Sequence, residues 1–212
     1  MDGARGRKRR GETSGVGPHI AWGPTLACKG ARRLDKTHLR FVGHEAASSV
    51  LHCFVLDGSA SMLASLAQAK GWLLDSFNRL ARERSDVALI RFGGDRAEVL
   101  FGPAVPRWWN ERWIEPIGGG GGTPLPAGVA AATRLLDQAR RRHASQVRVL
   151  WVLTDGRLHD IPSRPSAADR VVVVDCERGR ITLGGSERLA LAWGAECVHL
   201  DEIARYELGT EQ

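Results

Sequence analysis

The stretch LHCFVLDGSASM, residues 51–62, decides the fold that this sequence predicts. It begins as an apolar run rich in Leu, Val and Phe, which is typical of a buried strand, and Gly58 breaks the pattern. Asp57, Ser59 and Ser61 follow the run at alternate positions, so we expect them on the loop at the strand's carboxyl end. All three carry hard oxygen donors, which suit Mg²⁺ better than Zn²⁺ or copper.

Strand and helix patterns alternate along the chain on both sides of this stretch. Strands are predicted at residues 48–57, 86–92, 97–101, 147–153, 170–175 and 197–200, and helices at 63–84, 107–117, 124–143 and 187–194. The second and third strands flank a Gly-Gly-Asp turn, which predicts an antiparallel hairpin at the sheet edge. The alternation predicts a three-layer, doubly wound α/β fold. Its sheet is mostly parallel with one antiparallel edge strand, and helices cover both faces.

The length and composition limit the cellular location and the kinds of partner that we expect for this protein. The 212 residues suffice for one α/β domain with a sizeable core and a tail. No apolar run of about 18 residues is present, so no membrane partner is expected. The basic N-terminus lacks the apolar run of a secretory signal, and we expect a cytoplasmic location. The four cysteines form no CxxC pair and are expected to be buried, reduced thiols, the alternative being a zinc site of Cys28 with His38 or His44.

Positive charge is concentrated at the N-terminus. Residues 1–40 carry ten Lys or Arg against three Asp or Glu, whereas the remainder carries 20 against 21. We therefore predict a basic, mostly irregular lead-in over residues 1–45 and one domain over residues 46–212. A basic arm can contact nucleic acid or an acidic protein surface. Because no nucleic-acid-binding motif accompanies it, a solvated arm is expected and a nucleic-acid partner is not.

Two further oxygen donors follow later in the chain. Asp155 comes directly after the predicted strand at 147–153, and Thr123 follows a run of five glycines. The run is no phosphate loop, because no Gly-Lys-Ser/Thr follows it. Glycine does permit a close backbone approach, so the run can deliver the Thr123 hydroxyl beside Asp57.

Together these donors predict a metal site. Mg²⁺, or Mn²⁺ as the alternative, would be held by Asp57, Ser59, Ser61, Thr123 and Asp155. One coordination position would stay open for an acidic side chain of a partner protein. No catalytic residue and no organic cofactor are predicted. Arg157 and Trp108 are expected as further partner contacts.

The set Asp57-x-Ser59-x-Ser61, Thr123 and Asp155 resembles the metal-ion-dependent adhesion site of the von Willebrand factor A (VWA) family. Roughly residues 50–200 resemble the carboxyl-terminal part of the D subunit of magnesium chelatase and its cobalt-chelatase relatives. Stretches that carry this resemblance are residues 57–62, 69–71, 86–94, 97–100, 120–125 and 153–157.

The resemblance implies a VWA, Rossmann-like fold and a non-catalytic subunit. Its partners would be an AAA+ chelatase I-type ATPase subunit and a large catalytic subunit that inserts Mg²⁺ or Co²⁺ into a tetrapyrrole. The motifs fit the cobalamin and the chlorophyll route equally. This chain departs from the D subunit because it has no AAA+ module and no Walker A motif. ATP hydrolysis by the chain itself is therefore not expected.

Other functions compete with this interpretation. A generic intracellular VWA adaptor for an AAA+ ATPase unrelated to tetrapyrroles fits the same residues. An aspartyl-phosphate phosphatase would need a second Asp where Ser59 stands, and a serine hydrolase would need a GxSxG motif with an orienting His. An extracellular adhesion domain would be expected to have a signal peptide and disulfides. Finally, Ser59 or Ser61 could merely cap a helix.

Overall fold

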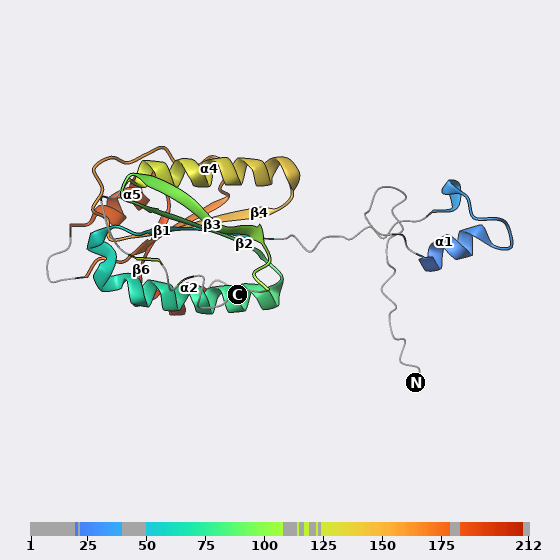
Figure 1. The fold of residues 1–212 in the computed structure, drawn as a ribbon, viewed down its shortest axis with the longest axis horizontal. Coiled ribbons are helices and arrows are strands. Elements are labelled where there is room, and N and C mark those ends of the chain that lie inside the picture. The colour runs from blue at the N-terminus through green and yellow to red at the C-terminus, as the bar shows by residue number, and fades with distance from the viewer. Residues whose placement is uncertain are drawn as a thin grey trace, which may run out of the picture. The chain divides into compact units, whose positions relative to one another are not determined.

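A computed structural model shows the fold and describes residues 20, 22–39, 50–107, 114, 117–118, 122, 124–178 and 183–209. The chain divides into two compact units, residues 1–47 and 48–212. The larger unit contains one six-stranded sheet with helices on both faces (Figure 1). Its strands are β1 (Val50–Asp57), β2 (Asp86–Gly93), β3 (Arg96–Ala104), β4 (Val147–Thr154), β5 (Arg170–Asp175) and β6 (Glu196–His199).

The sheet has the strand order β3-β2-β1-β4-β5-β6. All neighbours pair in parallel except β2 and β3, which form the antiparallel hairpin at one edge. The predicted fold class is thus confirmed. The strand order reverses between β1 and β4, and ligands of open α/β sheets bind at the carboxyl ends of the two strands beside such a reversal. The residues that directly follow β1 and β4 are therefore the ones to inspect for function.

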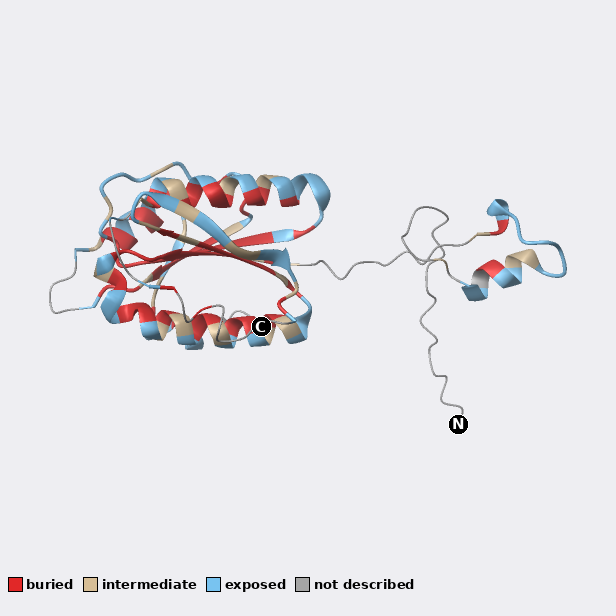
Figure 2. Ribbon diagram, viewed as in Figure 1, coloured by how far each residue is buried: buried red, intermediate tan, exposed pale blue. Residues whose placement is uncertain are grey.

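Two apolar cores hold the layers together (Figure 2). Alternate residues of β1 point to opposite faces, as in any strand: Cys53 and Val55 belong to one core, and Phe54 and Leu56 to the other. The first core lies under α4 (Leu125–Arg142) and α5 (Gly185–Trp193). The second lies under α2 (Leu63–Glu83), which the 3-10 helix η2 (Ala60–Met62) precedes, and includes Ile203 of α6 (Ile203–Gly209). Helices thus cover both faces of the sheet, as predicted.

The smaller unit contains α1 (Trp22–Lys29) and the 3-10 helix η1 (Lys36–His38), within the segment that the sequence predicts to be mostly irregular. Gly30 follows α1 with a positive φ of 54°, a common way for a helix to end. Asp35 caps η1 by accepting from the backbone N–H of Thr37, and His38 accepts from the backbone N–H of Asp35. This local polar pairing explains order in a stretch without a hydrophobic pattern.

Two further expectations need correction. The sequence pattern does not predict α6, because its seven residues are too short for a clear helical period. All four cysteines are free, but only Cys53 and Cys176 are buried; Cys28 is half-buried and Cys197 is exposed.

The predicted helix at 107–117, with Trp108, lies largely outside the described residues. None of the described helices has the length and apolar character needed to cross a membrane.

A partly buried titratable side chain packs against the second core. His52 stacks on Trp151 with ring centroids 6.3 Å apart, and the indole N–H of Trp151 donates to its Nδ1 at 3.2 Å. The pKa of His52 is lowered from 6.5 to about 4, chiefly by burial and in smaller part by the positive charges of Arg79 and Arg170. The folded protein therefore keeps this imidazole neutral where the unfolded chain would protonate it.

We predict that this histidine makes the protein acid-sensitive. Between pH 6.5 and 4 the unfolded chain binds a proton that the folded state does not, so stability falls as the pH is lowered through this window. The full loss attributable to His52 is about 3 kcal/mol. Urea unfolding of His52→Gln across this window should show a shallower pH dependence than wild type. The exposed His143→Gln serves as the control, and equal slopes for His52→Gln and wild type would contradict the prediction.

Candidate functional site

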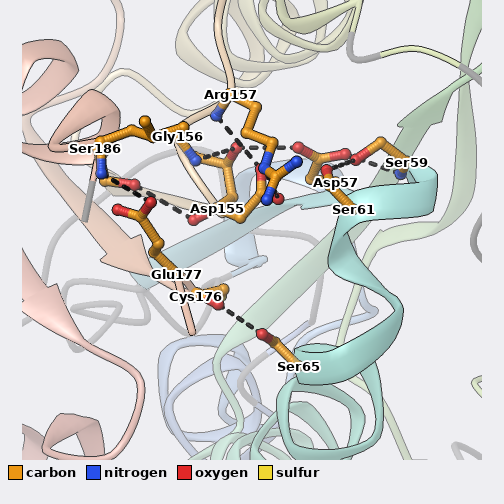
Figure 3. Close-up of polar contacts among 12 residues, drawn as sticks. Asp57, Ser59, Ser61, Ser65, Asp155, Gly156, Arg157, Cys176, Glu177 and Ser186 are labelled. Carbon is orange, nitrogen blue, oxygen red and sulfur yellow. Dashed lines mark hydrogen bonds and ion pairs between the residues drawn. The ribbon is translucent and has the colours of Figure 1, made fainter. Parts of the chain in front are cut away.

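Asp57 ends β1 and is completely buried. Its Oδ1 accepts a hydrogen bond from the backbone N–H of Ser59 at 2.8 Å, and its Oδ2 accepts from the hydroxyl of Thr154 at 2.9 Å. The bond from Ser59 closes a local turn, whereas the bond from Thr154 joins β4 to β1. The carboxylate is therefore held from both sides at the reversal of strand order (Figure 3).

Ser59 and Ser61 bring two hydroxyls together beside Asp57. Their Oγ atoms lie 3.0 Å apart, and Ser59 is only 1% exposed. Ser59 occupies the N-cap position of η2, yet its side chain makes no capping hydrogen bond there. Helix capping therefore does not explain Ser59, and its hydroxyl faces Ser61 instead.

Asp155 follows β4 and is 3% exposed. Its carboxylate accepts from the backbone N–H of Arg157 at 3.3 Å, and the Nε of Arg157 lies 3.4 Å from its Oδ2. In Figure 3 the Arg157 side chain folds back over Asp155, on the side that faces Asp57. Two acidic side chains, one at the end of β1 and one directly after β4, thus lie together at the carboxyl ends of these neighbouring strands.

Close backbone packing fixes the loop after β4. Gly156 has a positive φ of 71°, and its oxygen would lie 1.7 Å from a Cβ on Gly185. Thr154 adds to this arrangement, because its hydroxyl accepts from the N–H of Gly156 at 3.2 Å while its carbonyl accepts from Ser186. The loop that carries Asp155 is therefore pressed against the amino end of α5.

The glycine-rich segment approaches the same edge from β2. The carbonyl of Gly122 accepts from the N–H of Gly94 at 3.1 Å, and the carbonyl of Gly118 accepts from Arg91 at 2.8 Å. These contacts bring two residues that precede the predicted ligand Thr123, one of them its direct neighbour, to the end of β2, next to β1. Thr123 and Trp108 themselves lie outside the described residues, and their roles stay predictions.

The electrostatics of the site follow from its burial. Burial is the main cause that raises the pKa of the Asp57 carboxyl; hydrogen bonds from Ser59 and Thr154 oppose the rise, and the charge of Asp155 adds to it. Burial also raises the pKa of the Cys176 thiol, with added contributions from the negative charges of Asp175, Asp57 and Asp155. The site is thus a buried concentration of negative charge.

The donor set fits a hard cation. Asp57, Ser59, Ser61 and Asp155 offer only oxygen atoms, and within the described ranges Asp57 has no cationic partner. The described hydrogen bonds of Ser59 and Ser61 involve no histidine, so nothing there activates a serine nucleophile. The arrangement suits binding of Mg²⁺ or Mn²⁺ better than acyl or phosphoryl transfer.

Sequence reasoning missed the residues that hold the site together. The sequence shows Thr154 only as the neighbour of Asp155, because its bond to Asp57 depends on the pairing of β1 with β4. Arg91 lies in the predicted strand 86–92, and only the structure shows that it donates to the glycine-rich segment. The one available signal is the polar Thr154 at the end of the apolar run 147–153; Arg91 lies inside its strand and carries no such signal.

Comparison with known proteins places this unit in a family. Residues 53–157 match the model of the von Willebrand factor type A domain. The chain carries a von Willebrand factor type A domain. The solved structure of BatB from Bacteroides thetaiotaomicron resembles it with a TM-score of 0.57 and 20% identity, covering 77% of this chain and 97% of that chain. At this identity the likeness shows the fold alone.

Relatives in sequence include magnesium-chelatase subunits. The 60 kDa subunit of Rhodobacter capsulatus is 38% identical over 105 residues, 49% of this chain and 18% of that protein. The 67 kDa subunit of Chlorobaculum parvum is 33% identical over 111 residues, 52% of this chain and 18% of that protein. Rv2850c of Mycobacterium tuberculosis is 34% identical over 163 residues, 71% of this chain and 26% of that protein.

The resemblance predicted from the motifs is therefore confirmed at the level of the VWA family and of similarity to magnesium-chelatase subunits. The chain spans 18% to 26% of the length of these relatives. The activities and partners of the full-length relatives are therefore only hypotheses for this chain.

We predict that the glycine contact behind the site is essential to the fold. A Cβ on Gly185 would overlap the carbonyl of Gly156, so Gly185→Ala should lower the free energy of unfolding by at least about 2 kcal/mol. Gly71→Ala is the matched control: it lies in α2 with open space around it and should stabilise by about 0.5–1 kcal/mol. Urea unfolding measures both, and equal effects would refute the packing argument.

Proposed function

We propose that this VWA domain is a non-catalytic, metal-dependent protein-binding module of a tetrapyrrole metal chelatase. Mg²⁺ would be held by Asp57, Ser59, Ser61, Thr123 and Asp155, and when bound it would accept a carboxylate oxygen of a partner protein as a further ligand. The observation that carries the proposal is the hydrogen bond from Thr154, the residue before Asp155, to the buried Asp57.

Three features of the chain support this function over its rivals. Two carboxylates and two hydroxyls share one edge of the sheet, beside the reversal of strand order. Asp57 is buried without a cationic partner among the described residues, a costly arrangement that a divalent ion would relieve. The chelatase subunits match this chain over about half its length, which supports their complex as the setting.

The partner role follows from charge. Asp57 and Asp155 supply at most two negative charges, so a bound Mg²⁺ would be roughly neutralised and could still accept an acidic ligand. The proposed partners are the AAA+ I-type ATPase subunit and the large catalytic subunit of the chelatase. The residues of this chain would position the ion and exclude water from its protein side, and the chemistry of metal insertion would belong to the partner.

Metal binding predicts a ligand-dependent stability. Mg²⁺ at 100 times its dissociation constant should stabilise the wild-type chain by about 2.7 kcal/mol. Asp57→Asn should lose this gain, whereas its unfolding free energy in EDTA should stay equal or rise, because a buried negative charge is removed. Thermal unfolding with and without Mg²⁺ measures the difference. Asp160→Asn, an exposed residue of the same loop region, should retain the Mg²⁺ effect.

The ligand outside the described residues has a separate test. Thr123→Ala should weaken the Mg²⁺-dependent stabilisation and leave unfolding in EDTA unchanged, because the hydroxyl would contribute a ligand and not a packing contact. A midpoint that falls equally with and without Mg²⁺ would make Thr123 a structural residue.

Partner binding should depend on the same ion. We expect the chain to retain the I-type ATPase subunit or the large chelatase subunit of its own organism in Mg²⁺ and to release it in EDTA. Asp57→Ala should abolish this retention, and Asp160→Ala should preserve it. Retention that EDTA leaves unchanged would contradict the metal bridge. Mg²⁺-dependent retention of an AAA+ ATPase from outside tetrapyrrole synthesis, with neither chelatase subunit retained, would favour the generic adaptor.

A further inference from the structure

A cavity of about 550 Å³ adjoins the loop that carries Asp155. It is lined by Gly156, Arg157, Leu158, His159, Leu183 and Arg188. The first four residues follow β4, and the other two come from the amino end of α5 and the residues before it. The metal site uses none of these side chains, so the cavity calls for its own explanation.

The cavity is rich in positive charge. Arg157 is 60% exposed, although its Nε reaches Asp155. Arg188 is exposed on the first turn of α5, and no ion pair joins it to any part of the chain that the structure describes. Apart from Asp155, the carboxylates nearest in sequence to these arginines are Asp160 and Glu187, which are both exposed and do not line the cavity. The two guanidinium groups therefore favour an anionic occupant.

The cavity is also partly apolar. Leu158 packs against the first core and leaves part of its surface toward the cavity, and Leu183 is 57% exposed. Leu183 is nevertheless held in place, because its backbone N–H donates to Oε1 of the buried Glu177 at 2.8 Å. An exposed leucine on a fixed backbone beside two exposed arginines is typical of a surface that binds another protein.

The cavity has a fixed position relative to Asp155. The backbones of Gly156 and Gly185 are in such close contact that neither has room for a side chain. The N–H of Leu158 donates to the carbonyl of Gly156 at 2.8 Å, which closes a tight turn. Since these contacts join the loop to α5, the arginines and leucines keep one spacing from the proposed metal site.

We propose that this cavity is a second anchor for the same partner segment that reaches the metal. It binds a second acidic side chain on Arg157 and Arg188 and an apolar side chain on Leu158 and Leu183, a few residues along the partner chain from the coordinating carboxylate. The occupant is thus an acidic segment with an apolar residue. This inference rests on the proposed function and adds the feature that selects among acidic partners.

Synthetic fluorescent dodecapeptides test the anchor on the full chain in Mg²⁺. One peptide carries a single central Asp among Gly and Ser. The peptides of a second set carry in addition one Leu and one Glu, and they differ in how many residues separate these two from the Asp. Fluorescence anisotropy should show that one offset of Leu and Glu strengthens binding by about tenfold or more. Arg188→Glu should remove this gain and keep the Mg²⁺-dependent rise of the thermal midpoint. Exchanging the peptide Glu for Lys should weaken binding to wild type and restore it to Arg188→Glu.

Arg142→Glu is the matched control, since Arg142 is an exposed arginine at the far end of α4. It should keep the full gain. If peptides bind only in Mg²⁺ but Leu and Glu add nothing at any offset, or Arg188→Glu leaves their gain intact, the anchor is overturned and the metal bridge stands. If no peptide binds in a Mg²⁺-dependent way, both the anchor and the proposed function are overturned.

Discussion

The hydrogen bond between Thr154 and Asp57 joins the ends of β1 and β4, and the candidate site depends on it. These strands are neighbours in space although about 100 residues separate them in sequence. Their pairing places Asp57, the serines that follow it and Asp155 at one point of the sheet edge. A buried carboxylate is costly unless it is bonded, and the Thr154 hydroxyl and the Ser59 N–H offset part of that cost.

The surrounding structure restricts how these groups can move. The apolar cores on both faces fix the strands, and the contact between Gly156 and Gly185 fixes the loop after β4 against α5. On the other side, hydrogen bonds from Gly94 and Arg91 fasten the glycine-rich segment to β2. The proposed metal site needs ligands that are held in position before the ion arrives, and backbone packing holds these residues in place. The cavity beside Arg157 has the same rigid support.

The VWA domain and its similarity to magnesium-chelatase subunits connect this geometry to a class of proteins. Fold likeness alone does not define function: BatB has the same fold at 20% identity. The interpretation as a protein-binding module therefore comes from the oxygen donors and from the charge of the site. The proposed anchor in the cavity adds selectivity, because a metal ion by itself accepts any accessible carboxylate.

The sequence by itself determined the order and type of most elements. The apolar runs of β1, β4 and β5 and the helical periods of α2 and α4 are local patterns, so the fold class follows from them. It also predicts Asp57, Ser59, Ser61 and Asp155 as candidate ligands at one end of the sheet, because polar residues after a buried strand are visible in the sequence. Shorter elements were harder: α6 and α1 lack a strong period, and the burial of each cysteine depends on what packs over it. Only the tertiary structure decided that Thr154 bonds Asp57, that Gly156 meets Gly185 and that Arg157 and Arg188 share a cavity. Each of these contacts joins residues from different elements, and their distance in space is set by strand pairing and packing, which no local pattern encodes.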